Sequence, residues 1–282
     1  MKKLIIYASL FFTAINIFAQ NPFDAPENAL WHETSGSWYV SSLGGGKVTL
    51  EEDNYGWISR LDANGKVITA KWVEGLHAPT GMAAVGNTLY AADRGRVAVI
   101  DISSAKLLKF IPLPGSQFVN DVAATSDGDV YISDTFTDRI YRLPKGGDPE
   151  VFIESSRLEY PNGLWVDGNT LIVATWGPMT DRTTFATSRP GTILKINMKI
   201  REISPPGKVM QVANLDGIVK YKKDYYATDW TGGRLLKIDP EGNVTEIMKG
   251  YTQLADLGID QTRGVVMLVE MSSNRVFILK LE

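Results

Sequence analysis

Short apolar runs separated by polar turns recur along the chain, and no segment beyond the N-terminus shows sustained helical periodicity. Each repeat opens with a four-residue phrase whose second residue is polar, and a further apolar run follows within about a dozen residues. The six phrases are Pro26-Glu27-Asn28-Ala29, Pro79-Thr80-Gly81-Met82, Val119-Asn120-Asp121-Val122, Pro161-Asn162-Gly163-Leu164, Leu215-Asp216-Gly217-Ile218 and Ala255-Asp256-Leu257-Gly258. Their spacing of about forty to fifty residues is typical of β-propeller blades. The pattern therefore predicts an all-β fold, a six-bladed β-propeller.

Runs of Val, Ile, Tyr and Leu bounded by Gly, Asp and Asn give each blade the signature of successive strands and turns. The predicted blades are residues 26–76, 77–117, 118–159, 160–212, 213–253 and 254–282. Blade six ends after its third strand, at 276–281. We expect its outer strand to come from residues 21–25, which would close the ring.

Two blades are longer than the others and carry insertions after their second strands, at Leu43–Tyr55 and Trp176–Pro190. In an up-and-down blade, the loop after strand two lies at the same end as the start of strand one. The insertions should therefore lie at the same end of the propeller as the polar phrases. The acids that close the second strands should lie at this end too; they are Asp93, Asp134, Asp229 and Glu270. Alternatively, they are surface loops without a function, since insertions are tolerated at many surface positions.

The second positions of the phrases should meet on the propeller axis, because they are equivalent in every blade. They are Glu27, Thr80, Asn120, Asn162, Asp216 and Asp256. Glu27, Asn120, Asn162 and Asp216 together offer an oxygen-only ligand set, which suits Ca²⁺ first, with Mg²⁺, Mn²⁺ or Zn²⁺ as alternatives. The sequence thus predicts an axial metal site. The alternative is that these Asn and Asp residues only stabilise turns.

The N-terminus reads as a secretory signal, with Lys2 and Lys3 before an apolar core and a small residue, Ala19, at the expected cleavage point. We expect residues 1–19 to be the signal peptide and residues 20–282 the propeller domain, in a periplasmic or secreted protein. An uncleaved anchor is the alternative. Loss of the two lysines would change the formal net charge from −3 to −5. This acidity argues against a nucleic-acid partner, and after cleavage no membrane association is expected.

The composition excludes several kinds of chemistry. There is no Cys, which removes thiol catalysis, disulfides and thiolate metal sites, and no G-x-S-x-G motif marks a serine hydrolase. His77 precedes the second phrase and is either a substrate contact or a plain loop residue. Trp176 and Trp230 follow second strands, where they either wall a pocket or belong to the core.

The phrases, taken in order with Leu30-Trp31 and Thr228-Asp229-Trp230, resemble the senescence marker protein/gluconolactonase family, to which regucalcin belongs. More distantly the chain is similar to paraoxonases, diisopropyl fluorophosphatase and strictosidine synthase. The resemblance covers the whole mature chain and implies a six-bladed propeller with a divalent metal on its axis. It implies that Glu27, Asn162 and Asp216 bind the metal, that Asn120 lies close to metal and substrate, and that Asp216 is the catalytic acid/base.

One departure from that family concerns the substrate. Its sugar lactonases typically carry an Arg two residues before the asparagine equivalent to Asn120, and here the residue is Phe118. A phenyl ring cannot donate hydrogen bonds to sugar hydroxyls.

The leading hypothesis is a secreted, divalent-metal-dependent hydrolase of small-molecule lactones or related esters. Asp216 and Asn120 are its catalytic candidates. The substrate-binding candidates are Phe118, Thr80, His77, Trp176, Trp230 and Asp256. The alternatives are a non-catalytic propeller that binds a ligand or protein around a structural metal, and a phosphoester or organophosphate hydrolase that uses the same site.

Overall fold

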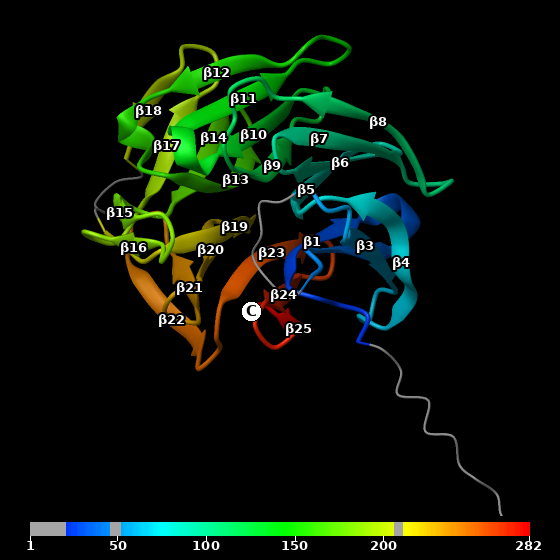
Figure 1. Ribbon diagram of the computed structural model, residues 1–282. Helices are drawn as coiled ribbons and strands as arrows, with labels where there is room; N and C mark the ends of the chain where they lie inside the picture. Colours follow the sequence, from blue (N-terminus) through cyan, green and yellow to red (C-terminus); the bar gives the residue numbers. More distant parts are fainter. Residues whose placement is uncertain (1–20, 46–51, 206–210) are drawn as a thin grey trace, which may run out of the picture.

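The computed structural model describes residues 21–45, 52–205 and 211–282. The predicted signal peptide, residues 1–19, and residues 46–51 of the first insertion lie outside the described residues. The described strands form six antiparallel sheets around a central axis, and one separate two-stranded hairpin (Figure 1). The protein is therefore an all-β six-bladed propeller, as the repeat predicts.

The strand order within each blade runs outward from the axis in sequence order. Blades one to three contain β1 (Pro26–His32), β2 (Ser37–Ser42), β3 (Gly56–Leu61), β4 (Val67–Leu76), β5 (Pro79–Val85), β6 (Thr88–Asp93), β7 (Arg96–Asp101), β8 (Lys106–Pro112), β9 (Val119–Ala124), β10 (Val130–Asp134), β11 (Arg139–Leu143) and β12 (Glu150–Glu154). Blades four to six contain β13 (Pro161–Asp167), β14 (Thr170–Thr175), β17 (Ile193–Asn197), β18 (Glu202–Ser204), β19 (Leu215–Tyr221), β20 (Asp224–Asp229), β21 (Arg234–Ile238), β22 (Val244–Lys249), β23 (Leu254–Asp260), β24 (Val265–Glu270) and β25 (Arg275–Lys280). Every blade lies within its predicted bounds.

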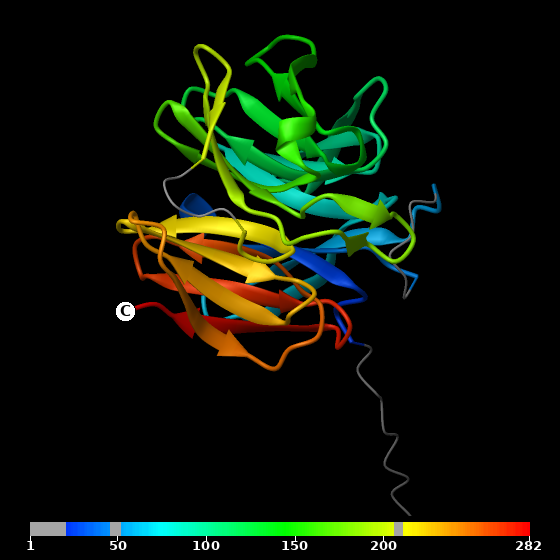
Figure 2. The ribbon, with the colours of Figure 1, turned by 90° about the vertical axis from the view of Figure 1, so that its left-hand side faces the viewer.

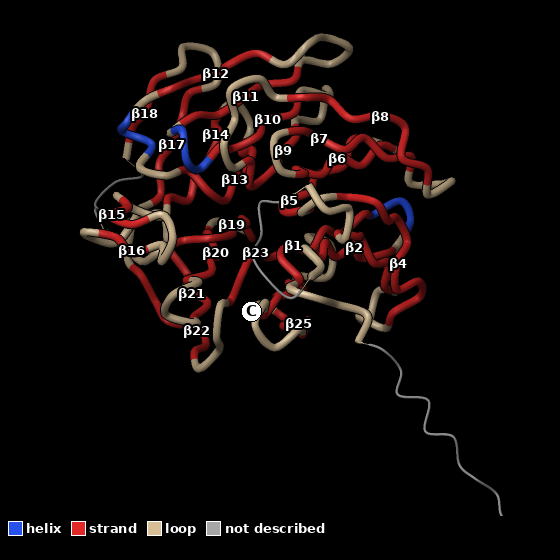
Figure 3. The backbone as a smooth tube through the Cα atoms, viewed as in Figure 1, coloured by secondary structure: helices blue, strands red, loops and turns tan. Residues whose placement is uncertain are grey.

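The second insertion contributes the separate hairpin, β15 (Met179–Asp181) and β16 (Ala186–Thr187). The helical segments of the described chain are short 3₁₀ turns, η1 (Glu33–Ser35), η2 (Thr135–Thr137) and η3 (Ser156–Leu158) (Figure 3). Within residues 21–45, 52–205 and 211–282, no helix is long and apolar enough to cross a membrane.

The hydrophobic core lies between neighbouring blades. Between blades three and four, for example, Tyr131 and Phe152 pack with Leu171 and Ile196, all of them buried. The Tyr131 and Phe152 rings meet edge to face, with their centroids 5.0 Å apart. Phe152→Ala would leave a cavity in this interface and cost about 3–5 kcal/mol of stability. The blades are thus held by side-chain packing that the alternating strand pattern supplies.

The ring closes differently from the prediction for residues 21–25. Blade six has the three strands β23, β24 and β25, and residues 21–25 form no strand beside them. The Pro22 carbonyl instead accepts hydrogen bonds from Trp57 Nε1 at 3.1 Å and Ser59 Oγ at 3.1 Å, both on β3. The Leu43 backbone N–H donates to the Ala25 carbonyl. The segment is also bonded to blade six, where Asn21 Nδ2 donates to the Asn274 carbonyl at 3.1 Å and the Ala25 N–H donates to Asn274 Oδ1 at 2.7 Å. It therefore links blades six and one without forming a fourth strand. Closure comes from the packing of β23 on β1, where a Cβ at Gly258 would overlap the Ala29 carbonyl.

Both insertions lie at one end of the propeller, as far as they are described. Pro26 pairs with Ser42, so β1 begins at the end where β2 finishes, and the same pairing occurs in blade four between Pro161 and Thr175. Turned by 90°, the molecule shows the hairpin β15–β16 at this end, to the right in Figure 2. The expectation that the long loops share the end with the polar phrases is confirmed.

Candidate active site

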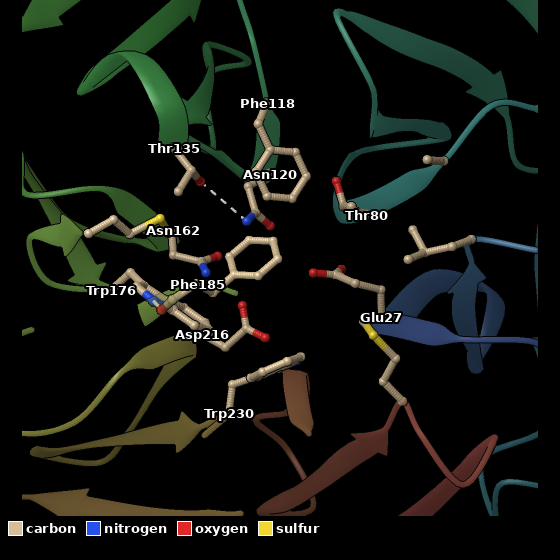
Figure 4. Close-up of a pocket in the computed structure, with 14 residues that line it drawn as sticks. Glu27, Thr80, Phe118, Asn120, Thr135, Asn162, Trp176, Phe185, Asp216 and Trp230 are labelled. Carbon is tan, nitrogen blue, oxygen red and sulfur yellow. Dashed lines mark hydrogen bonds between the residues drawn. The ribbon is translucent and has the colours of Figure 1, made fainter. Parts of the chain in front are cut away.

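A cavity opens on the propeller axis at this end (Figure 4). The inner strands and η2 supply its polar lining, and the surrounding loops supply most of its apolar lining. The polar residues are Glu27, Thr80, Asn120, Thr135, Asn162 and Asp216. The apolar residues are Leu43, Ala78, Phe118, Trp176, Met179, Phe185, Trp230 and Met271. Five of the six residues predicted to meet on the axis do so here.

A β-bulge at the start of every inner strand turns these side chains toward the axis. In blade one, Pro26 pairs with Ser42 and Ala29 with Val40, so β1 advances three residues while β2 advances two. The same shift occurs in the other five blades. A bulge places two residues opposite one, so the second and third positions of each phrase both point inward.

Hydroxyl groups of the middle strands support the bulges. Three of them accept the backbone N–H that the bulge leaves unpaired at the third position: Ser41 Oγ from Asn28 at 3.0 Å, Ser133 Oγ from Asp121 at 2.9 Å and Thr228 Oγ1 from Gly217 at 2.9 Å. Each of these hydroxyl residues interrupts an otherwise apolar strand in the sequence. This interruption could have indicated the bulge, which the repeat of the four-residue phrases does not reveal.

Hydrogen bonds orient the first of the two amides of the cavity. Asn120 Nδ2 donates to Thr135 Oγ1 at 3.2 Å, and Thr135 Oγ1 donates in turn to the Pro161 carbonyl at 2.8 Å. The Asn162 side chain and the Asp216 carboxylate line the same cavity, and Asn162 acts to lower the pKa of Asp216. Both amides present their carbonyl oxygens toward the centre, where Glu27 and Asp216 also point (Figure 4).

Two buried carboxyls share this small space without a cationic side chain among the cavity's lining residues. Burial raises the pKa of Glu27 well above its ordinary value, and the charges of Asp216, Asp256 and Asp121 raise it further. Burial also raises the pKa of Asp216, as does the charge of Asp256, while the Asn162 amide opposes the shift. Ionisation of both groups therefore requires a positive charge from elsewhere.

The residues present fit a hard divalent cation. Glu27 Oε2 is buried and has no hydrogen-bond partner, so it has an unused lone pair at the centre of the cavity. Together with Asp216 and the amide oxygens of Asn120 and Asn162, it makes an oxygen-only donor set of the kind that Ca²⁺ prefers. In the described residues, no cluster of three or more His, Cys, Asp or Glu has the arrangement of a metal site, so any cation here would depend on the two amides.

Asp256 is not part of the cavity, which corrects its predicted place. Leu254 pairs with Glu270 and Leu257 with Leu268, so the second position of blade six is Ala255 and Asp256 is the third. Asp256 lies in a deeper layer of the axis, where Asn28 Nδ2 donates to its Oδ2 at 2.7 Å. A Cβ at Gly217, the third position of blade five, would overlap the Asp256 carboxylate. A register error of one residue in the aligned phrases explains the difference.

His77 also lies outside the cavity lining, although it is buried in the loop before β5. Its backbone N–H and that of Ala78 donate to Asp93 Oδ1 at 2.8 and 3.0 Å. Asp134 Oδ1 accepts the Phe118 backbone N–H in the same way at 2.7 Å. The acids at the ends of second strands are thus loop anchors.

Aromatic side chains form a continuous wall over the polar residues. Phe118 and Phe136 have ring centroids 5.0 Å apart, and Phe136 lies 6.2 Å from Phe185. Phe185 lies 5.8 Å from Trp176, which lies 5.5 Å from Trp230. The sequence pattern suggested Phe118, Trp176 and Trp230 as pocket residues. It gave no sign of Phe185, which the folded hairpin brings into the cavity, or of Phe136, which packs behind Phe118 and Phe185 on η2 without lining the cavity.

Comparison with known proteins supports the fold. No protein-family model matches the chain, and no curated protein matches its sequence. A gluconolactonase from Xanthomonas campestris matches the structure with a TM-score of 0.70 at 15% identity, over 93% of this chain and 88% of that one. A catalytically inactive virginiamycin B lyase from Staphylococcus aureus, solved with quinupristin, matches with a TM-score of 0.61 at 15% identity, over 91% and 95%. A streptogramin B lyase gives a TM-score of 0.61 at 15% identity, over 93% and 95%. At this identity the likeness establishes the propeller fold and leaves the activity open.

Proposed function

We propose that the protein is a secreted or periplasmic, divalent-metal-dependent hydrolase of lactones or related esters, akin to the gluconolactonase family. One observation carries the proposal. Glu27, Asn120, Asn162 and Asp216 converge on one cavity, and an oxygen of Glu27 is buried there without a partner. Ca²⁺ is the preferred cation, with Mg²⁺, Mn²⁺ or Zn²⁺ as alternatives.

A divalent cation held by these four oxygens would polarise an ester carbonyl and neutralise charge that develops on its oxygen. Asp216 is the acid/base, because its carboxylate lines the cavity and can take a proton from an attacking water. It accepts a proton as water attacks the carbonyl carbon, and the bond to the alkoxy oxygen breaks. Asp216 then returns the proton to the departing alkoxide. When the substrate is a lactone, the product is a hydroxy acid.

Two asparagines would act beside the reacting groups. Asn162 lines the cavity with Asp216 and would favour the ionised form of the carboxylate that moves the proton. Asn120 is fixed by Thr135 and presents its carbonyl oxygen beside the carbonyl under attack. The surrounding apolar walls limit the access of further water to the site.

The test is hydrolysis of a panel of simple lactones and aryl esters by protein treated with a chelator and then supplied with Ca²⁺, Mg²⁺, Mn²⁺ or Zn²⁺. We expect turnover that depends on the cation, and a loss of at least about a hundredfold in kcat/KM in Glu27→Gln. Glu202→Gln, an exposed change of the same kind on β18, is the matched control and should retain full activity. Cation binding without turnover of any ester would contradict the proposal and favour a binding propeller, whereas turnover of phosphoesters alone would favour the phosphoesterase alternative.

A further inference from the structure

The hairpin β15–β16 crosses from blade four to blade three at the mouth of the cavity. At its base, the Trp176 and Gly177 backbone N–H groups donate to the Tyr160 and Glu159 carbonyls at 2.9 and 3.1 Å. Near its tip, Arg182 donates to Gln117 Oε1 at 2.9 Å and to the Phe136 carbonyl at 2.7 Å. The hairpin is therefore tied down at both ends.

Arg182 also stacks on aromatic rings beside the cavity. Its guanidinium carbon lies 5.0 Å from the centroid of Phe136 and 5.9 Å from that of Tyr160. An exposed arginine that makes two directional hydrogen bonds and two ring contacts fixes the tip with respect to blade three.

The hairpin places one aromatic ring in the cavity. Phe185 lies between Trp176 and Trp230, with ring centroids 5.8 and 6.3 Å away, and Figure 4 shows its ring directed toward Asn162 and Asp216. Its carbonyl accepts a hydrogen bond from Trp176 Nε1 at 3.0 Å. Its φ is 57°, in the left-handed region that a bulky side chain rarely adopts. The surrounding contacts thus hold Phe185 in an unfavourable backbone conformation that directs its ring inward.

Phe185 leaves little room beneath it. The volume open to the centre of a water molecule is about 50 Å³, whereas pockets that enclose small organic ligands measure about 300–1,000 Å³. None of the lining residues is a Lys, Arg or His. The charge of the proposed divalent cation would be balanced by the carboxylates of Glu27 and Asp216, so the cavity would offer no net positive charge to a substrate carboxylate or phosphate. An uncharged substrate with an apolar substituent matches these apolar walls, but it fits only if the Phe185 ring moves aside.

We propose that the hairpin determines substrate specificity: the substrate is an uncharged ester or lactone with a short alkyl or aryl substituent that packs against Phe118, Trp176 and Trp230, and Phe185 limits its size. This inference rests on the proposed hydrolase function. It adds the substrate class and the residue that sets the upper size limit.

The first experiment measures kcat/KM for 4-nitrophenyl acetate, butyrate and octanoate in the cation-loaded protein. In Phe185→Ala, the ratio of octanoate to acetate activity should rise about tenfold or more over that of the wild type, because the cavity is enlarged. Thr184→Ala, an exposed change on the same hairpin outside the cavity lining, is the matched control and should keep the wild-type ratio. An unchanged ratio in Phe185→Ala would overturn the inference.

A second experiment separates the inference from the hydrolase function. Binding of the neutral apolar dye N-phenyl-1-naphthylamine is followed by fluorescence in the wild type and both variants. Affinity should rise about tenfold in Phe185→Ala and stay unchanged in Thr184→Ala. If no ester is turned over but this difference appears, the hydrolase proposal fails while the size-limiting role of Phe185 stands. If esters are turned over but neither ester ratio nor dye affinity depends on Phe185, the inference fails and the hydrolase proposal stands.

Discussion

At the scale of single residues, the candidate site depends on which carboxylates have partners. Asp229 belongs to an ion pair, since Arg234 Nη2 lies 2.5 Å from its Oδ2, and Gly232 N–H donates to its Oδ1 at 3.0 Å. Asp216 faces the cavity, and none of the described residues that line the cavity is a Lys, Arg or His. The two aspartates are similarly buried but have different roles. Asp229 anchors a loop, whereas Asp216 is available to a ligand.

This difference predicts how calcium changes thermal stability. Ca²⁺ should raise the Tm of the wild type, because a ligand that binds only the folded state stabilises it, by about 2.7 kcal/mol at a hundredfold excess over Kd. Asp216→Asn removes a charged ligand and should reduce the rise. Asp229→Asn should lower the Tm without calcium yet keep the calcium-dependent rise. Differential scanning calorimetry of the three proteins checks this, and equal rises in wild type and Asp216→Asn would exclude Asp216 as a ligand.

The apolar side chain of Phe118 in the cavity wall leads to a prediction about which substrates are hydrolysed most efficiently. The wild type should hydrolyse gluconolactone weakly and less hydroxylated lactones or aryl esters better, because an apolar wall offers no donors to sugar hydroxyls. The backbone at this position is fixed by Asp134, so Phe118→Arg should place a guanidinium in the cavity and shift preference toward aldonolactones. Comparison of kcat/KM for both substrate classes in both proteins is the measurement. Efficient gluconolactone hydrolysis that Phe118→Arg leaves unaltered would show that this position does not set specificity.

At the scale of elements, the bulge of each inner strand is what turns consecutive residues toward the axis. In blade three the bulge depends on Ser133, whose Oγ lies 2.9 Å from the Asp121 backbone nitrogen. Both groups are buried, so water cannot replace the hydroxyl. The positions of Asn120 and Asp121 are therefore tied to a residue of the neighbouring strand.

Removal of this hydroxyl should destabilise the protein. Ser133→Ala leaves a buried N–H without an acceptor, and we expect a loss of about 1–3 kcal/mol in the free energy of unfolding. Urea denaturation followed by tryptophan fluorescence measures it. Ser126→Ala, in the exposed turn between β9 and β10, is the control and should change stability by less than about 0.5 kcal/mol. A loss no larger than that of the control would mean that another group accepts the Asp121 N–H.

At the scale of the whole molecule, the six blades bring acidic groups from distant parts of the chain together on one axis. Asp121, Asp216, Asp256 and Glu27 come from four blades, and burial raises the pKa of each. For Asp256 burial raises the pKa to about 6, against the hydrogen bonds from the Leu257 backbone N–H and from Asn28. Ring closure thus buries these carboxyls together on the axis, and this burial disfavours their charged forms.

This arrangement predicts a pH dependence of stability. A carboxyl whose pKa is raised on folding contributes stability below its unfolded pKa of about 3.9, and loses that contribution as the pH rises through the folded value. Relative to Asp256→Asn, the chelator-treated wild type should therefore lose about 2 kcal/mol between pH 4 and pH 7. Urea denaturation of both proteins across this range measures the difference. A difference that stays constant with pH would contradict a raised pKa of Asp256.

The sequence by itself determined the repeat, the blade bounds and five of the six residues of the axial ring, because strand alternation and turn composition are local properties. Three features depended on the tertiary structure. The register of blade six placed Ala255 in the ring and Asp256 beneath it, since a bulge is set by pairing with the next strand. Residues 21–25 link blades one and six without forming a strand, because Trp57 and Ser59 donate to Pro22 while Asn274 bonds to Asn21 and Ala25. Phe185 reached the cavity only through the folded hairpin and its contacts with another blade, which no periodicity in the chain records.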